Sequence, residues 1–220
     1  MSIRLKSDES FDAPLTAGPG AVPQTSDGTF RAKGKCSEQV MKSNIERLGP
    51  FFAKGKHLNV VVETPKGSRV KYAYEPKSGF FILSKALPEG MVFPFNFGFV
   101  PRTLAEDGDP LDMLVLNEEP LISGCLLQVR PIAVIKATQT EHGKPVRNDR
   151  LIGQALGKET PLELQTLKLE KKVVSQIEFF FSAYNKLYGK KFKVIGTGGP
   201  RKAMEIVRRA IKLWRKKKDH

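Results

Sequence analysis

Three aspartates lie within six residues of one another, in the segment Asp107-Gly-Asp-Pro-Leu-Asp112. The Gly and Pro between them favour a turn, and an apolar run, Met113–Leu116, follows directly. Carboxylates held this close repel one another unless cations neutralise them, and hard divalent ions such as Mg²⁺ prefer oxygen ligands. The spacing predicts a cation site in which Asp107 and Asp112 converge across a turn that a strand anchors.

A polar surface turn is the simplest alternative, because Asp-Gly and Asp-Pro pairs are common in turns. An EF-hand is excluded, since its loop needs Gly at the sixth position, which counted from Asp107 is Asp112. The glycine-rich run Gly196-Thr-Gly-Gly-Pro-Arg-Lys has the wrong spacing for a phosphate-binding P-loop and is typical of the start of a helix. The motif by itself therefore leaves a metal site and a surface turn open.

Bulk composition indicates one sizeable domain with a flexible appendage. The chain has 220 residues, of which 40% are hydrophobic and 27% charged. No apolar run approaches the roughly 20 residues of a membrane span, and the first residues lack the apolar stretch of a signal peptide. The only cysteines, Cys36 and Cys125, cannot form a disulfide framework. We expect a cytoplasmic protein with no membrane partner.

The net charge of +14 is concentrated at the C-terminal end, where residues 186–220 hold thirteen Lys or Arg against two acidic residues. Such a run could contact nucleic acid, but a solvated helix face is the simpler interpretation. A nucleic-acid-binding module is a disfavoured alternative, because the aromatic row Phe93, Phe95, Phe97 and Phe99 alternates mainly with Pro, Asn and Gly rather than with basic residues. That row is typical of a core.

Short strand-like runs separated by Gly and Pro turns dominate the middle of the chain. They cover residues 58–64, 70–75, 80–84, 113–116 and 126–136. Helical periodicity is predicted for about 163–188 and for 200–217, the latter starting at a proline, with a shorter helical pattern within 37–54. The pattern predicts an α+β fold, with a small, highly curved sheet or barrel and two principal helices.

The segment Asp107-Gly-Asp-Pro-Leu-Asp-Met resembles the signature of family I soluble inorganic pyrophosphatases. The resemblance extends over about residues 58–195, with further motifs in the family's order. These motifs are Val61-Val-Glu-Thr-Pro, Lys71-Tyr, Pro94-Phe-Asn-Phe-Gly-Phe, Arg150-Leu-Ile and Phe180-Phe-Ser-Ala-Tyr184. The resemblance implies an OB-like β-barrel and three segments: a flexible extension with a short helix at 1–56, a catalytic domain at 57–200, and a basic C-terminal helix at 201–220.

The resemblance further implies hydrolysis of inorganic pyrophosphate to two phosphates by a metal-activated water. The cofactor would be Mg²⁺, with Mn²⁺ or Zn²⁺ as alternatives, and the protein would be a homo-oligomer. Asp109 would be the catalytic base, while Asp107, Asp112 and Glu63 would hold metal ions. The positions implied to contact phosphate are Lys71, Lys85, Arg150 and Tyr184.

A second acidic loop departs from the family pattern, in which two Asp separated by four residues precede a cation. Here Gln139-Thr-Glu141 and Arg147-Asn-Asp-Arg150 stand in its place. A register set by Arg150 makes Asn148 the last metal ligand, whereas a rebuilt loop would use Glu141 and Asp149. The departures resemble a branch of bacterial pyrophosphatase-like chains, and they keep a catalytically weak or inactive pyrophosphate-binding relative as an alternative.

Overall fold

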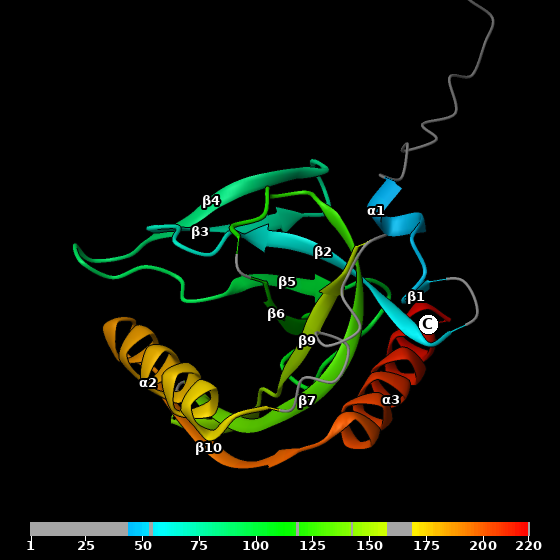
Figure 1. The fold of residues 1–220 in the computed structure, drawn as a ribbon. Helices are drawn as coiled ribbons and strands as arrows, with labels where there is room; N and C mark the ends of the chain where they lie inside the picture. Colours follow the sequence, from blue (N-terminus) through cyan, green and yellow to red (C-terminus); the bar gives the residue numbers. More distant parts are fainter. Residues whose placement is uncertain (1–43, 53–54, 118, 142, 158–168, 220) are drawn as a thin grey trace, which may run out of the picture. The chain divides into compact units, whose positions relative to one another are not determined.

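The computed structural model describes residues 44–52, 55–117, 119–141, 143–157 and 169–219 (Figure 1). Its helices are α1 (Asn44–Arg47), α2 (Lys171–Leu187) and α3 (Pro200–Lys218). Its strands are β1 (Phe51–Phe52), β2 (His57–Thr64), β3 (Val70–Glu75), β4 (Phe80–Ala86), β5 (Asn96–Val100), β6 (Leu111–Leu116), β7 (Leu126–Glu141), β8 (Lys144–Arg147), β9 (Arg150–Leu156) and β10 (Lys191–Gly198). In these ranges no helix has the length and apolar character required for a membrane span.

Five strands close into a barrel in the order β2-β5-β6-β9-β7, because β7 pairs back onto β2. All neighbours in this ring are antiparallel except β6 and β9, which are parallel. The long strand β7 continues beyond the ring and pairs with β8 and β10, and β3 and β4 form a separate hairpin (Figure 1). The predicted α+β class with a small, OB-like barrel is confirmed.

Both faces of the central strands are buried, which explains their continuous apolar runs. Along β6, Met113 and Val115 pack in one hydrophobic cluster with residues of α3, whereas Leu114 packs in a second cluster with residues of α2. Leu151 and Ile152 of β9 divide between the two clusters in the same way. Successive side chains of a strand point to opposite faces, so the barrel wall is fixed between two apolar layers.

The two long helices bury one stripe each, as an amphipathic pattern predicts. Helix α3 begins at Pro200 after an extended Gly199, and it buries Ala203, Val207 and Ala210 while its basic side chains remain largely exposed. This confirms the helix predicted for 200–217. Helix α2 begins at Lys171; residues 158–168, over which part of the predicted helix ran, lie outside the described ranges.

Five strands of the described residues were not predicted: β1, β5, β8, β9 and β10. Every residue of β5 is buried, and its alternating aromatic row was interpreted as core without being assigned to a strand. In β10 buried Phe192 and partly buried Val194 also alternate with exposed residues, but the flanking glycines and the basic surroundings obscured this pattern. Strand β7 also extends five residues beyond the predicted end at 136.

Close contact between β2 and β5 predicts the consequence of adding one methyl group. A Cβ atom at Gly98 would lie 2.1 Å from the backbone oxygen of Val61, which cannot move without breaking the barrel pairing. We expect Gly98→Ala to lower the free energy of unfolding by about 1–3 kcal/mol, measured by urea denaturation. Gly49→Ala is the matched control, because nothing lies within 4 Å of its added Cβ; equal stability of the two variants would contradict the packing.

Candidate active site

A pocket of about 280 Å³ gathers carboxylates and cations in one lining. Its acidic lining consists of Asp107, Asp109 and Asp112. The same pocket is lined by the predicted phosphate-contacting residues Lys71, Lys85, Arg150 and Tyr184, and it also includes Asn148. Eight of the eleven predicted site residues, drawn from strands, loops and a helix far apart in the sequence, therefore line one cavity.

The loop between β5 and β6, which we call the acid loop (residues 105–112), is held by its own backbone. The Ala105 N–H donates to the Asp109 carbonyl over 2.7 Å, and the Asp109 N–H donates to Asp107 Oδ1 over 3.3 Å. Gly108 has φ +93°, a left-handed conformation that an L side chain rarely adopts. This turn brings Asp107 to the same pocket as Asp112, the pair for which the sequence motif predicted convergence, and Asp109 lines the pocket with them.

The two lysines come from the β3–β4 hairpin, whose register makes Lys71 and Lys85 direct cross-strand partners. The Lys71 ammonium lies 5.5 Å from the centre of the Phe97 ring, and the Lys85 ammonium lies 4.0 Å from that of Tyr188. Burial lowers the pKa of Lys71, and the carboxylate of Glu63 partly offsets this effect. The hairpin thus presents two positive charges side by side, which favours a ligand with several negative oxygens.

Arg150 is the most buried charge of the pocket, at 5% exposure. The parallel register that pairs Met113 with Leu151 places Arg150 beside Asp112, and these two side chains form an ion pair. Arg150 also donates to Asn148 Oδ1 over 2.6 Å and lies 4.8 Å from the centre of the Phe181 ring. Burial lowers the pKa of Arg150 to about 10, so it remains a cation at neutral pH.

Two buried donors in this pocket have no hydrogen-bond acceptor: the Tyr184 hydroxyl and Nε of Arg150. Burial raises the pKa of Tyr184 to about 12, which keeps the phenol protonated and able to donate. An unpaired buried polar group is destabilising by about 1–3 kcal/mol. Such orphaned donors are expected where a ligand with acceptor oxygens completes the site.

Glu63 does not line the pocket, but it interacts electrostatically with Lys71 and Asp109. Its Oε1 accepts a hydrogen bond of 2.9 Å from the Tyr74 N–H. Burial is the main cause that raises the pKa of Glu63, and it also raises the pKa of Asp107, with the charge of Asp109 adding to the effect there. The raised pKa values of Glu63 and Asp107 favour the protonated forms of these two carboxylates in the absence of a cation.

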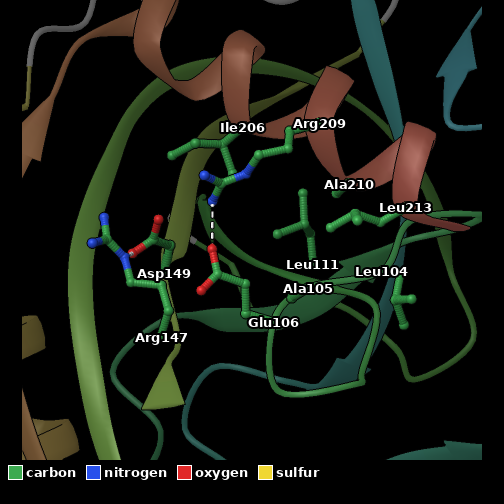
Figure 2. A pocket seen from close by; sticks show the side chains of 10 residues that line it. All are labelled: Leu104, Ala105, Glu106, Leu111, Arg147, Asp149, Ile206, Arg209, Ala210 and Leu213. Atoms are coloured by element: carbon green, nitrogen blue, oxygen red, sulfur yellow. Dashed lines mark hydrogen bonds and ion pairs between the residues drawn. The ribbon is translucent and has the colours of Figure 1, made fainter. Parts of the chain in front are cut away.

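The structure does not bring Asp149 to the other predicted ligands. Asp149 lies in a different pocket, where its Oδ1 accepts hydrogen bonds from Arg147 Nε at 2.5 Å and from the Ala137 N–H at 3.1 Å (Figure 2). Its neighbours Asn148 and Arg150 line the active-site pocket instead. Glu141 ends β7, and its side chain lies outside the described part of the chain.

Gln139 lines the pocket together with Asn148, a role the sequence analysis did not assign. Asn148 Nδ2 donates to Gln139 Oε1 at 3.5 Å, and both side chains are buried. The sequence signal for this role of Gln139 was the departure of the second loop from the acidic pattern. That signal does not specify the residue, because only the pairing of β7 with β8 determines which residue of 139–141 faces Asn148. Two neutral amides thus occupy this side of the site.

The donor set fits a hard cation, because three carboxylates and two amide oxygens meet in one cavity. Asp112 is paired with Arg150, and within the described ranges no three His, Cys, Asp or Glu side chains are already arranged as a metal-binding cluster. Asp107 and Asp109 form no ion pair in the described residues, whereas a cation bound by Asp112 would share that carboxylate with Arg150.

The inorganic pyrophosphatase family matches the chain over residues 60–215. An inorganic pyrophosphatase of Nanoarchaeum equitans is 38% identical over 159 residues, which cover 70% of this chain and 96% of the relative. The enzyme of Caulobacter vibrioides is 35% identical and covers 71% of this chain and 89% of its own. The crystal structure of the Thermus thermophilus inorganic pyrophosphatase superimposes with a TM-score of 0.70 at 31% identity, over 79% of this chain and 99% of that chain. The chain belongs to the inorganic pyrophosphatase family.

Proposed function

We propose that this chain hydrolyses inorganic pyrophosphate to two phosphates, and that the pocket of the acid loop is the active site. The observation that carries the proposal is that Asp107, Asp109 and Asp112 line one cavity together with cations and orphaned donors. Pyrophosphate with a bound divalent cation supplies positive charge to the carboxylates of this cavity and negative charge to its cations. The relatives named as inorganic pyrophosphatases support the same substrate.

Asp107 and Asp112 would hold Mg²⁺, with Glu63 and Asn148 as further oxygen donors; Mn²⁺ or Zn²⁺ would be alternatives. A bound divalent ion neutralises phosphate oxygens and lowers the pKa of water. Gln139 and Asn148 are neutral, so these two amides add no negative charge for binding a metal ion. We propose that the reaction depends mainly on the three carboxylates of the acid loop.

Positioning of the phosphates is the task of the basic side. Arg150, fixed between Asp112, Asn148 and the Phe181 ring, would donate to a phosphate oxygen from its orphaned Nε. The Tyr184 hydroxyl would donate to a second oxygen, since burial keeps it protonated. Lys71 and Lys85 would neutralise charge that accumulates on the leaving phosphate.

Asp109 would accept the proton of the attacking water. Its carboxylate lines the pocket, and in the described residues it accepts no hydrogen bond and forms no ion pair. Asp107, by contrast, accepts from the Asp109 N–H, and Asp112 is paired with Arg150. The free lone pairs of Asp109 make it the carboxylate best placed for general base catalysis.

The remaining expectations complete the proposal. Residues 57–200 would form the catalytic domain, 1–56 an extension and 201–220 a basic helix that belongs to the same body. The protein would act in the cytoplasm as a homo-oligomer. Exposed apolar side chains on the hairpin and on α2, such as Phe80 and Phe179, provide surfaces on which copies could associate.

Asp109→Asn tests the catalytic assignment. The amide has the same shape but cannot accept a proton, so we expect phosphate release from Mg²⁺-pyrophosphate to fall by about 10²–10⁴-fold. Calorimetric affinity for the non-hydrolysable analogue imidodiphosphate should change little, because the phosphate-contacting residues are intact. Phosphate release at the wild-type rate would contradict the role of Asp109, and absence of release by the wild-type protein with Mg²⁺, Mn²⁺ or Zn²⁺ would contradict the proposed activity.

The raised pKa values of Asp107 and Glu63 predict a pH dependence of stability in EDTA. As pH rises above 3.8, the ordinary pKa of Asp107, the native state retains protons that the unfolded state releases. The free energy of unfolding therefore falls as the pH rises, until the pH exceeds the raised pKa of the native state. We expect this fall, measured by thermal unfolding, to be smaller in Asp107→Asn and smaller for the wild-type protein when Mg²⁺ replaces EDTA. Identical pH profiles for wild type and variant would contradict the assigned cause.

A further inference from the structure

A second cavity, of about 470 Å³, lies against the acid loop but shares no lining residue with the active-site pocket. Gly108 and Pro110 of that loop line this cavity, whereas Asp107 and Asp109 line the active site. We call it the Trp214 pocket and define it by Tyr74, Phe99, Arg102, Trp214, Lys217 and Lys218. Its volume is within the range of small-molecule sites, about 300–1,000 Å³.

Aromatic rings form part of its wall. The rings of Tyr74 and Phe99 are stacked, with centroids 6.0 Å apart and planes 23° apart. Trp214, from the last turns of α3, lines the same pocket. Phe99 is buried behind Tyr74, so the ring surface open to an occupant belongs to the half-buried Tyr74 and Trp214. Such a surface favours an occupant with a planar ring, because stacking removes apolar faces from water.

Positive charge is concentrated at the same place. The Arg102 guanidinium lies 5.6 Å, and the Lys218 ammonium 4.8 Å, from the centre of the Trp214 ring. Lys217 also lines the pocket, and Glu46 is its single acidic residue. The lining therefore has a net positive charge and favours an anion.

Arg102 is held in an uncommon conformation. Its φ of +52° makes it the only non-glycine residue of the described chain with a positive φ, a feature that clusters at ligand clamps. Its Nε donates to the Glu46 carbonyl over 3.0 Å, which fixes the side chain. The terminal guanidinium nitrogens form no hydrogen bond within the described ranges, so this rigid fork is available to bind an oxyanion.

We propose that the Trp214 pocket binds a nucleoside phosphate, with the base on the aromatic wall and the phosphates on Arg102, Lys217 and Lys218. Inorganic phosphate alone would leave the ring surfaces uncovered. An uncharged ring compound would leave the three cations without a counter-charge. A nucleoside di- or triphosphate satisfies both halves of the pocket and matches its volume.

Trp214 is the only tryptophan of the chain, so its fluorescence reports on this pocket alone. We expect adenosine diphosphate, titrated without divalent metal, to change this fluorescence saturably with a Kd below about 1 mM. Adenosine and inorganic phosphate, titrated separately, should each bind at least about tenfold more weakly. A phosphate affinity equal to that of adenosine diphosphate, or no saturable change with the diphosphate, would overturn the proposal.

Substitutions then locate the bound nucleotide. Arg102→Gln and Lys217→Gln should each weaken adenosine diphosphate at least about tenfold, the effect of losing one charge-assisted hydrogen bond. Arg201→Gln is the matched control, because it removes the same charge from the exposed first turn of α3, at the other end of the helix. Lys217 is exposed, so its substitution tests the site even if Arg102→Gln unfolds.

Competition separates the Trp214 pocket from the active site. Imidodiphosphate, which should occupy the active-site pocket, is expected to leave the affinity for adenosine diphosphate unchanged, because the two cavities share no residue. Full displacement of the nucleotide by imidodiphosphate, or equal weakening by Arg201→Gln and Lys217→Gln, would overturn the assignment. These binding measurements do not require turnover, so they remain valid whatever the catalytic test shows.

Discussion

Repulsion between like charges is the constraint on which the rest of this structure depends. Asp107, Asp109 and Asp112 line one small pocket together with the cross-strand pair Lys71 and Lys85. Burial is the main cause that raises the pKa of Asp107 and lowers that of Lys71, and the charge of Asp109 adds to the first shift while the charges of Arg150 and Lys190 add to the second. A divalent cation relieves the first group and a polyanion the second, so the substrate complex supplies the charges that folding leaves uncompensated.

Strand register fixes the site residues that lie on strands, whereas the acid loop holds Asp107 and Asp109. The parallel pairing of β6 with β9 places Arg150 beside Asp112, and the β3–β4 register places Lys71 opposite Lys85. Both apolar layers of the wall are needed for this precision, since β6 and β9 are packed against one cluster on each face. An ion pair also links the acid loop to α3, between Glu106 and Arg209 at 3.0 Å (Figure 2). Strands thus hold Lys71, Lys85 and Arg150, and a turn holds Asp107 and Asp109.

The sequence predicted those features that local chemistry determines. The acid loop follows from its turn residues, and α3 follows from Pro200 and its apolar stripe. Strand β5 was not predicted because its alternating Phe row was interpreted only as core, and tertiary packing buries both of its faces. Gln139 could not be assigned, since only the pairing of β7 with β8 decides which residue faces Asn148. Asp149 lies outside the active-site pocket because its carboxylate pairs with Arg147, a contact that no motif encodes. The Trp214 pocket joins residues from α1 to α3 and has no local signal at all.

The central claim is that the acid loop gathers divalent cations against a phosphate-binding basic wall. Anomalous X-ray diffraction from crystals grown with Mn²⁺ and imidodiphosphate tests it most directly. The account predicts a manganese peak within coordination distance, about 2.0–2.3 Å, of carboxylate oxygens of Asp107 or Asp112, with phosphate oxygens facing Arg150 and Tyr184. Manganese bound elsewhere, with the acid-loop carboxylates facing only solvent, would contradict it.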